Sequence, residues 1–361
     1  KDTSGAVVAG ATVEARSAKL IGVATSTTDT SGAYRFPALP PGVYEIRASL
    51  PRFTAVTATD IELLLGQIKK IDLTLAVAGV AENVQVTTAA PIIDVRQTAT
   101  STHISKEFID KIPRGRDFTS VVMIAPGTNN ESKLAGISID GASGAENRYV
   151  IDGIDTTDIL YGTTGKRLIT DFLEEVQVKS SGYNAEFGAA TGGIINVISR
   201  SGANLWRREL GTYFGSDDLN GPPRKTLQID PNNNTRAEYV VFRDDDFTRW
   251  EPVVSVGGPI VRDRVWFFAG YAPALLTTER IVTFNRTGQA GRFRQDEQRH
   301  QITANLSTRI SNRVSGRFIS HVDHRRQQGV LPAKSGTGDP SVDYAVLGFR
   351  EPNATFSGNL D

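Results

Sequence analysis

The sequence contains no cysteine, no long apolar run and no excess of either charge. The absence of cysteine excludes a disulfide scaffold and a metal site built from thiolates. No apolar run approaches the roughly 18 residues that a transmembrane helix needs, so a membrane could be crossed only by strands. The 40 basic and 40 acidic residues balance, which argues against a nucleic-acid partner. The 361 residues, of which 39% are hydrophobic, leave room for two or three folded domains.

Residue clusters that carry out chemistry are also missing. The four histidines are His103, His300, His321 and His324, and the only close pair would point to opposite faces of a strand. No nucleophile elbow, phosphate-binding loop or His-x-x-Glu pattern occurs. The sequence therefore predicts no enzyme activity, no cofactor and no metal site.

Short alternating runs separated by turn residues fill residues 1–77. Turn signals lie at residues 29–32 and 39–42, while Tyr34 with Phe36 and the run 68–75 supply apolar sets on one face. This spacing predicts a small all-β sandwich. The patterns Gly-Ala-x-Val, Thr-Asp-x-x-Gly-x-Tyr-x-Phe and Leu-Pro-x-Gly-x-Tyr resemble the carboxypeptidase-regulatory-like domain, which is transthyretin-like. In that family the domain is an accessory module, so the resemblance implies no peptidase activity.

Glycines surround a short apolar strand between residues 182 and 204. The run Ile-Ile-Asn-Val-Ile at residues 194–198 predicts a buried strand, and Gly192 and Gly193 before it would let another backbone approach closely. A tight bend is the alternative explanation of these glycines.

A short helix is predicted near residue 105. Ser105 would cap a helix that ends before Pro113, with Phe108, Ile109 and Ile112 on its apolar side.

Two charged turns follow this helix. Arg114 and Arg116 could form an anion site, although solvated charges beside a helix start are the commoner arrangement. Asp152, Asp155 and Asp158 invite a metal interpretation, but they lack the spacing of a calcium loop. We expect a surface turn instead.

The order of these motifs resembles that of the TonB-dependent outer-membrane receptors, in particular the Oar-like group with an N-terminal carboxypeptidase-regulatory-like domain. The matching stretches are residues 112–127, 148–153 and 182–204. The resemblance implies that residues 78–205 form an α/β plug inside a β-barrel. It assigns plug-motif roles to Arg114, Gly115, Arg116, Asp152, Gly153, Gly192, Gly193 and Asn196.

A strand-competent segment with one acidic residue lies between the first two domains. It resembles a TonB box, the segment that pairs as an added strand with a periplasmic TonB-type energiser. The first strand of the plug is the alternative interpretation. The residues of this candidate site are Glu82, Val84, Val86, Thr87 and Ala89.

Residues 206–361 show the two-residue period of membrane strands. Apolar and polar residues alternate from 301 to 309, and the alternation continues after a short turn. A soluble sandwich would alternate in the same way. As lipid-facing residues the pattern predicts Ile302, Ala304, Leu306, Val314 and Phe318, with Asn305 on a watery lumen where an arginine would be tolerated. It also predicts an aromatic girdle of Trp266, Phe267, Phe268 and Tyr271.

The recognisable strands are far fewer than the 22 of a transporter barrel, so we expect the chain to be part of a longer polypeptide. The expected protein is mainly β, with a transthyretin-like sandwich (1–77), a plug (78–205) and the first strands of a transmembrane antiparallel barrel (206–361). The resemblance implies a transporter in the outer membrane of a Gram-negative bacterium. Its partners would be a TonB-type energiser, outer-membrane lipid and an unidentified extracellular substrate. An Oar-like structural or adhesion protein without transport activity is the alternative.

Overall fold

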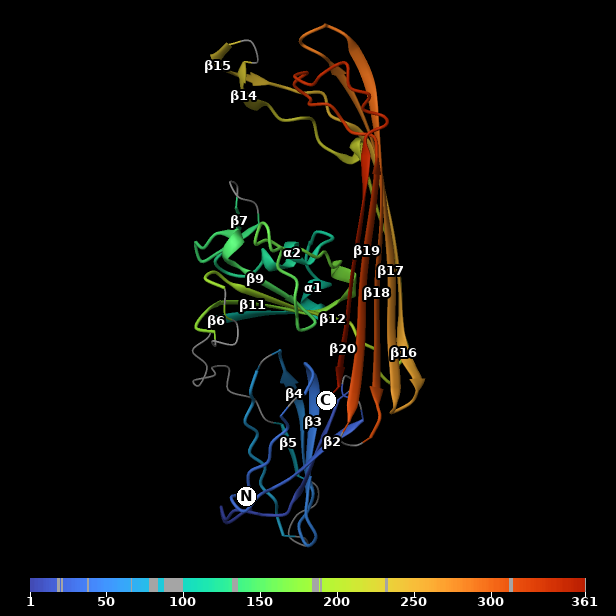
Figure 1. The fold of residues 1–361 in the computed structure, drawn as a ribbon. Coiled ribbons are helices and arrows are strands. Elements are labelled where there is room, and N and C mark those ends of the chain that lie inside the picture. Colours follow the sequence, from blue (N-terminus) through green and yellow to red (C-terminus); the bar gives the residue numbers. More distant parts are fainter. Residues whose placement is uncertain are drawn as a thin grey trace.

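The computed structural model describes residues 1–17, 20, 22–37, 39–65, 67–77, 84–87, 100–131, 136–183, 188, 190–230, 233–311 and 314–360. The chain is mainly β, as the sequence predicted, and three large sheets follow one another along it. Figure 1 shows the sandwich at one end, and the plug against one face of the long barrel sheet. No helix within the described ranges is long and apolar enough to cross a membrane.

The sandwich is built on a five-stranded sheet in the order β2-β1-β3-β4-β5. Val13 and Ala15 of one strand and Ile46 and Ala48 of the next are buried on one face, which the chain around Tyr34 covers. Alternation of small and branched apolar residues thus positions this core. The strands are β1 (Thr12–Arg16), β2 (Val23–Thr27), β3 (Gly42–Ser49), β4 (Val56–Leu63) and β5 (Val84–Thr87).

The plug contains a second five-stranded sheet, in the order β10-β9-β12-β11-β6. Its strands are β6 (Thr100–Ser105), β9 (Arg148–Ile151), β10 (Ile154–Asp155), β11 (Leu173–Ser181) and β12 (Ile194–Ser199). A small sheet of β7 (Thr128–Asn130) and β8 (Ile137–Ile139) lies beside it, with the helical elements α1 (Lys106–Ile109), α2 (Phe118–Val122), η1 (Gly144–Glu146) and η2 (Thr170–Phe172).

Helix α1 forms where it was predicted, but two of its expected details are wrong. Ser105 is the N-cap residue, yet its side chain makes no capping hydrogen bond. Phe108 is 48% exposed, whereas Ile109 is fully buried in the plug core. A single helical turn can bury only one narrow side, because side chains repeat every 3.6 residues.

The barrel segment forms one antiparallel sheet in the order β13-β16-β17-β18-β19-β20. Short turns join β16 to β17 and β18 to β19 at the end near the sandwich, while the long connections lie at the other end (Figure 1). The strands are β13 (Arg207–Ser216), β16 (Asp246–Val261), β17 (Val265–Thr283), β18 (Ala290–Arg309), β19 (Ser315–Gln328) and β20 (Gly348–Leu360). The connection after β13 holds η4 (Asp217–Leu219), β14 (Thr226–Asp230) and β15 (Asn233–Val240).

The two faces of the barrel sheet differ as the alternation predicted. Ile302, Leu306 and Phe318 lie exposed on the face away from the plug, and Ala304 shares that face with them. Val314 lies exposed in the turn before β19. This arrangement is that of transmembrane barrel strands, whose outer face meets lipid.

The predicted watery lumen at Asn305 is wrong. Asn305 is 2% exposed, and its amide donates a hydrogen bond to the carbonyl of Arg200 in the plug. The plug fills the space inside these strands, so an arginine at this position would collide with it.

The predicted aromatic girdle is half wrong. Phe267 and Tyr271 lie on the outer face, but Trp266 and Phe268 point inward and are 2% and 3% exposed. Adjacent residues of a strand point to opposite faces, so four aromatic residues in this run could not share one face. The Trp266 indole donates to Asn204 Oδ1 at 2.7 Å, which ties this strand to the end of the plug.

Candidate functional site: the interface between plug and barrel

The turn between α1 and α2 carries two arginines, of which one reaches the barrel. Asp117 begins α2, and its carboxylate accepts hydrogen bonds from the backbone and hydroxyl of Thr119, at 3.1 and 3.0 Å. Gly115 lies so close to Ser120 that an added Cβ would be 2.9 Å from the Ser120 Cβ. The capped helix and the close approach at Gly115 fix the turn that carries the arginines.

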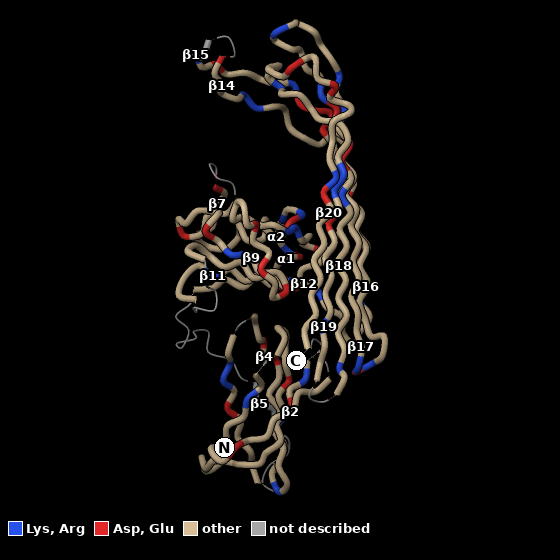
Figure 2. The backbone as a smooth tube through the Cα atoms, viewed as in Figure 1, with Lys and Arg blue, Asp and Glu red and all other residues tan. Residues whose placement is uncertain are grey.

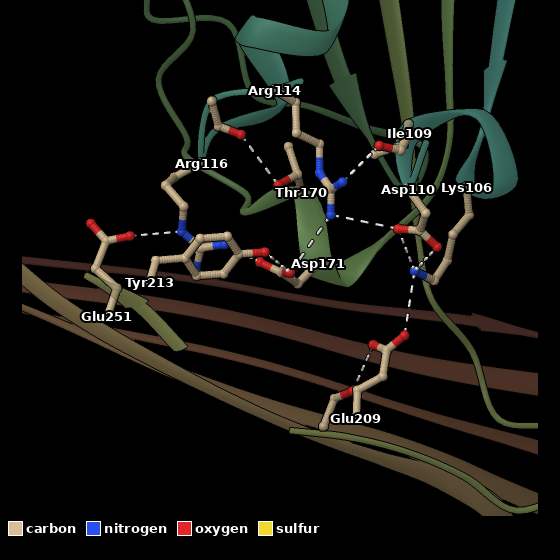
Figure 3. A network of polar contacts seen from close by, with 12 residues as sticks. Lys106, Ile109, Asp110, Arg114, Arg116, Thr170, Asp171, Glu209, Tyr213 and Glu251 are labelled. Carbon is tan, nitrogen blue, oxygen red and sulfur yellow. Dashed lines mark hydrogen bonds and ion pairs between the residues drawn. The ribbon is translucent and has the colours of Figure 1, made fainter. Parts of the chain in front are cut away.

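Arg116 joins the plug to two barrel strands. Its Nε donates to Glu251 Oε2 of β16 at 2.7 Å, and its Nη1 pairs with Asp171 of the plug. The guanidinium carbon lies 3.8 Å from the centre of the Tyr213 ring on β13, and the Tyr213 hydroxyl donates to Asp171 at 2.9 Å. Figure 3 shows these four side chains converging between the plug and the barrel strands. We call Arg116, Asp171, Tyr213 and Glu251 the latch.

Arg114 lies beside the latch but stays within the plug. Its Nη1 donates to the carbonyl of Ile109 at 2.7 Å, and its Nη2 lies 3.5 Å from Asp110 and 3.8 Å from Asp171. Both arginines are largely buried and face carboxylates (Figure 3). The expectation of solvated charges is therefore wrong for this pair, and the acidic partners leave no open anion site.

A second ion-pair group lies next to the latch. Glu209 of β13 pairs with Arg200 of the plug and approaches Lys106 of α1 at 3.4 Å, and Ser255 donates to it at 3.4 Å. Lys106 also binds Asp110 at 2.8 Å. Opposite charges from the two domains thus face one another along β13 and β16.

Apolar packing accompanies these charges. The Phe172 ring meets the Phe268 ring edge to face at 6.0 Å, and it lies directly over Gly270 of β17. Val253 and Ala272 of the barrel belong to the same buried cluster as the plug core. The plug and the barrel wall therefore share one hydrophobic core, which the charged groups border.

Asp152 makes another joint between plug and barrel. Its Oδ2 lies 2.8 Å from His321 Nε2 of β19, and its Oδ1 accepts from the backbone of Ser199 at 2.9 Å. Burial alone would raise the pKa of Asp152, but the bonds from His321 and Ser199 outweigh burial and lower that pKa below 3.8. The predicted surface turn is therefore wrong for Asp152, although it and Gly153 do adopt positive φ angles of 50° and 82°.

Lys166 extends this joint to β20. Its Nζ donates to the His321 carbonyl at 2.9 Å, to Asn353 at 2.9 Å and to Thr355 at 3.1 Å. Burial lowers the pKa of Lys166 to about 8. Nothing in the local sequence around Lys166 signals this role, because its partners lie more than 150 residues further along the chain.

The glycines before β12 permit close packing inside the plug. A Cβ at Gly192 would lie 2.7 Å from Asn147 Oδ1, and one at Gly193 would lie 2.4 Å from the Ile139 side chain. Asn147 Oδ1 accepts the Gly193 amide at 2.8 Å. The predicted approach of another backbone is present at Gly192, where the Glu146 backbone carbon would lie 3.2 Å from the added Cβ, whereas at Gly193 it is a side chain that approaches. Within the described part, Asn196 Oδ1 is buried without a hydrogen-bond partner, and a plug-motif role of Asn196 stays a prediction.

We expect Gly193→Ala to lower the free energy of unfolding of the plug by about 1–3 kcal/mol, because the new methyl group overpacks Ile139. Urea unfolding, followed by the far-ultraviolet circular dichroism of the backbone, measures this change. Gly211→Ala is the matched control, since no atom lies within 4 Å of the added Cβ there. Equal stability of the two variants would contradict the close approach.

The sandwich docks on the plug through a polar contact that the sequence did not reveal. The backbone amide of Leu65 donates to Glu175 Oε1 at 3.1 Å, and Gln177 Nε2 donates to the Leu65 carbonyl at 3.0 Å. His103 Nδ1 lies 2.8 Å from the same Glu175 oxygen. Two buried side chains of β11 thus hold both backbone groups of one sandwich residue.

The candidate TonB box lies at the edge of the sandwich. Val84–Thr87 form β5, which pairs in parallel with β4, so that Val84 lies opposite Val56 and Val86 opposite Ala58. Glu82 and Ala89 lie outside the described residues. The sheet to which β5 belongs is that of the sandwich, not that of the plug.

No group of three metal-ligating side chains occurs among the described residues. A cavity of about 310 Å³ lies between the plug and the barrel wall, and charged side chains dominate its lining. These are Arg116, Asp117, Arg167, Arg249, Glu251, Glu297 and Arg299. The cavity borders the latch, because Arg116 and Glu251 belong to both.

Comparisons with known proteins agree with this arrangement. Residues 1–76 match the family model of the carboxypeptidase regulatory-like domain. The chain is 33% identical over 296 residues to the TonB-dependent transporter Oar of Myxococcus xanthus; the match covers 79% of this chain and 27% of Oar. The chain thus spans about a quarter of that relative's length.

One solved structure shares the fold over part of its length, and a second is a more distant match. The outer-membrane transporter YddB from Escherichia coli matches with a TM-score of 0.55 at 19% identity, over 72% of this chain and 36% of YddB. A mutant of the ferric enterobactin receptor from Pseudomonas aeruginosa matches with a TM-score of 0.47 at 16% identity, over 73% of this chain and 39% of the receptor.

Proposed function

Because the chain belongs to the Oar-like group of TonB-dependent outer-membrane receptors, we propose that it takes part in energised uptake of an extracellular substrate across the outer membrane of a Gram-negative bacterium. It supplies the sandwich, the plug and the first barrel strands of the transporter. The observation that carries the proposal is the latch, a charged joint that holds a separate plug against the inside of a membrane-type sheet.

A plug that must move needs contacts with the barrel that are strong at rest but can be broken by force. The latch and the joint at Asp152 depend on charged hydrogen bonds at a few points, and a modest displacement of the plug breaks all of them together. Water then enters the interface through the charged cavity beside Arg116 and hydrates the separated groups. The two joints therefore favour a closed plug at rest and a reversible opening under force.

The pull reaches the plug through the sandwich in this proposal. A TonB-type energiser pairs with the strand β5, and β5 is hydrogen-bonded to the sandwich, whose Leu65 is held by Glu175 and Gln177 of the plug. The guanidinium of Arg309 also holds the carbonyl of Val23 at 3.2 Å, so the sandwich is attached to the barrel as well. Displacing the sandwich would therefore pull on the plug through the contacts of Leu65 with Glu175 and Gln177.

We expect Val84→Pro and Val86→Pro to weaken binding of the purified periplasmic domain of a TonB-type energiser by about tenfold or more, because each removes a backbone donor needed for strand pairing. A pull-down titration of the membrane-inserted protein measures this. Val84→Ala and Val86→Ala are matched controls that keep the donors and should retain binding.

The same titration separates transport from the structural alternative. If none of these variants binds differently from the wild type, β5 is not the energiser's strand. If the wild type binds no energiser at all, the Oar-like structural or adhesion role replaces uptake.

A further inference from the structure

The hydrogen-bonded ladder between β16 and β17 is interrupted beside the plug. Pairing runs from Asp246 to Trp250 of β16 and resumes at Val254. Between these points the register places Pro252 opposite Pro273, and neither proline has an N–H group to donate. Proline is rare inside a central strand because it removes a ladder hydrogen bond. The barrel wall therefore loses pairing at one place, and the charged cavity described above lies there.

The cavity lies on the side of the plug that faces the long connections of the barrel. On β18 its lining residues Glu297, Arg299 and Gln301 are further from the sandwich than Asn305, which the plug covers. Figure 2 shows basic and acidic residues close together on the barrel strands just above the plug. Long connections face the outside of the cell in outer-membrane barrels, so a solute from outside reaches the cavity first.

Most charged groups around the cavity have close partners. Arg299 holds Asp323 through two hydrogen bonds, and Arg325 holds Glu297 in the same way, at 2.8 and 2.9 Å. Arg116 is engaged in the latch. These groups form the wall of the cavity and neutralise one another.

Two further arginines line the cavity without a close partner. Arg167 Nε lies 4.0 Å from Asp117 Oδ2, and Arg249 Nε lies 3.9 Å from Glu251 Oε1. Both distances exceed that of a hydrogen bond. The two side chains are 59% and 51% exposed, so solvent and solutes reach both guanidinium groups. They are the cavity's available cations.

Apolar side chains accompany these arginines in the lining. Ile169 comes from the plug, and Ala272, Ala274 and Leu276 come from β17. The cavity volume of about 310 Å³ is at the small end of ligand pockets, which occupy about 300–1,000 Å³. The lining therefore combines two cations with a surface for a small hydrocarbon group.

We propose that this cavity binds a small organic monocarboxylate. Its carboxylate accepts hydrogen bonds from Arg167 and Arg249, because the planar guanidinium group matches a carboxylate in geometry. Its hydrocarbon part packs on Ile169 and Leu276, a contact that an inorganic anion cannot make. A second negative charge on the ligand would be repelled by the carboxylates of Asp117 and Glu251. The inference rests on the proposed function, since it names a class of extracellular ligand, but binding itself needs no energiser.

The experiment is a calorimetric titration of the purified protein in neutral detergent with three probes. Benzoate is the monocarboxylate, benzamide is its uncharged counterpart of similar shape, and inorganic phosphate is an anion without a hydrocarbon part. We expect the wild type to bind benzoate about tenfold or more tightly than either other probe. Arg167→Gln combined with Arg249→Gln should weaken benzoate binding about tenfold or more and leave benzamide binding unchanged.

Two further variants test the place of the site. Ala274→Phe keeps every charge but fills the cavity, so it should abolish binding of both benzoate and benzamide. Arg262→Gln with Arg264→Gln removes two exposed charges at the turn between β16 and β17 and is the matched control, which should bind benzoate normally. Unchanged thermal unfolding shows that each variant is folded.

Absence of benzoate binding by the wild type, equal affinities of the double variant and the wild type, or equal loss in the control would overturn the proposal. Phosphate or benzamide bound as tightly as benzoate would overturn the monocarboxylate as ligand. A double variant that loses benzoate and keeps normal energiser binding supports the site as separate from energiser coupling. A wild type that binds benzoate but no energiser would overturn the proposed uptake and support this site alone.

Discussion

Replacing Arg116 with alanine should weaken the attachment of the plug to β13 and β16. The change leaves Asp171 and Glu251, whose side chains are 14% and 12% exposed, without their shared cation. Breaking a buried ion pair in this way costs about 3–5 kcal/mol, and we expect the lower end because all three side chains keep some contact with water. Heat or urea unfolding of the purified protein measures the loss.

A single introduced cysteine reports directly how often the plug separates from the barrel wall. The chain has no cysteine, so Ala272→Cys places one thiol on the inner face of β17, where Ala272 is 3% exposed against the plug. Labelling of this thiol by a polar maleimide should be slow in the otherwise unchanged protein and fast when Arg116→Ala is added.

The matched control is Arg167→Ala, because Arg167 also belongs to the plug but is 59% exposed and lies 4.0 Å from Asp117. A surface pair of this kind contributes about 0–1 kcal/mol. The double change Arg116→Ala with Glu251→Gln should cost less than the two single changes together, because the second removes the uncompensated charge. Additive losses, or equally slow labelling in all variants, would show that the latch does not hold the plug.

Arginine at Ala304 should destabilise the inserted barrel by about 2–4 kcal/mol if this residue lies near the middle of the bilayer. Ala304 lies on the outer face of β18, between Ile302 and Leu306, which are exposed on the same face. A guanidinium there must remain in hydrocarbon or distort the membrane to reach water. Unfolding in urea from lipid vesicles measures the difference.

Gln298→Arg is the control on the same strand and the same face. Gln298 is exposed on the same face, six residues closer to the end with the long connections, and an added arginine near a membrane surface costs about 0–1 kcal/mol. Asn305 is unsuitable as a control, because it is buried beneath the plug. Similar losses of unfolding free energy at residues 298 and 304 would contradict the placement of residue 304 near the middle of the bilayer.

Much of the fold followed from the sequence because the relevant signals are local. Turn residues at 29–32 and 39–42 mark the sandwich, and strict alternation from 301 to 309 marks a strand with two different faces. Gly193 signalled a close approach because only glycine lacks the Cβ that would meet Ile139. Each of these depends on spacing of a few residues.

The partners of the charged side chains depended on the tertiary structure. Arg116 meets residues 55 and 135 positions away, and Asp152 meets a histidine 169 positions away. Charge alone favours water for such groups unless folding supplies counter-charges, and the sequence does not say where those lie. The expectations of solvated arginines and of a surface turn at Asp152 were wrong for this reason.

Alternation by itself determined that neighbouring residues of a barrel strand face opposite ways, but it did not determine what covers each face. Trp266, Phe268 and Asn305 lie on the inner face and are buried, because the plug covers that face. A period of two residues does not specify what lies against either face of a strand. Likewise, the sequence marked residues 84–87 as able to form a strand, while pairing with β4 decided the sheet. Local periodicity sets the conformation of a segment, whereas contacts between distant segments choose its partners, because burial and hydrogen bonding depend on what is nearby in space.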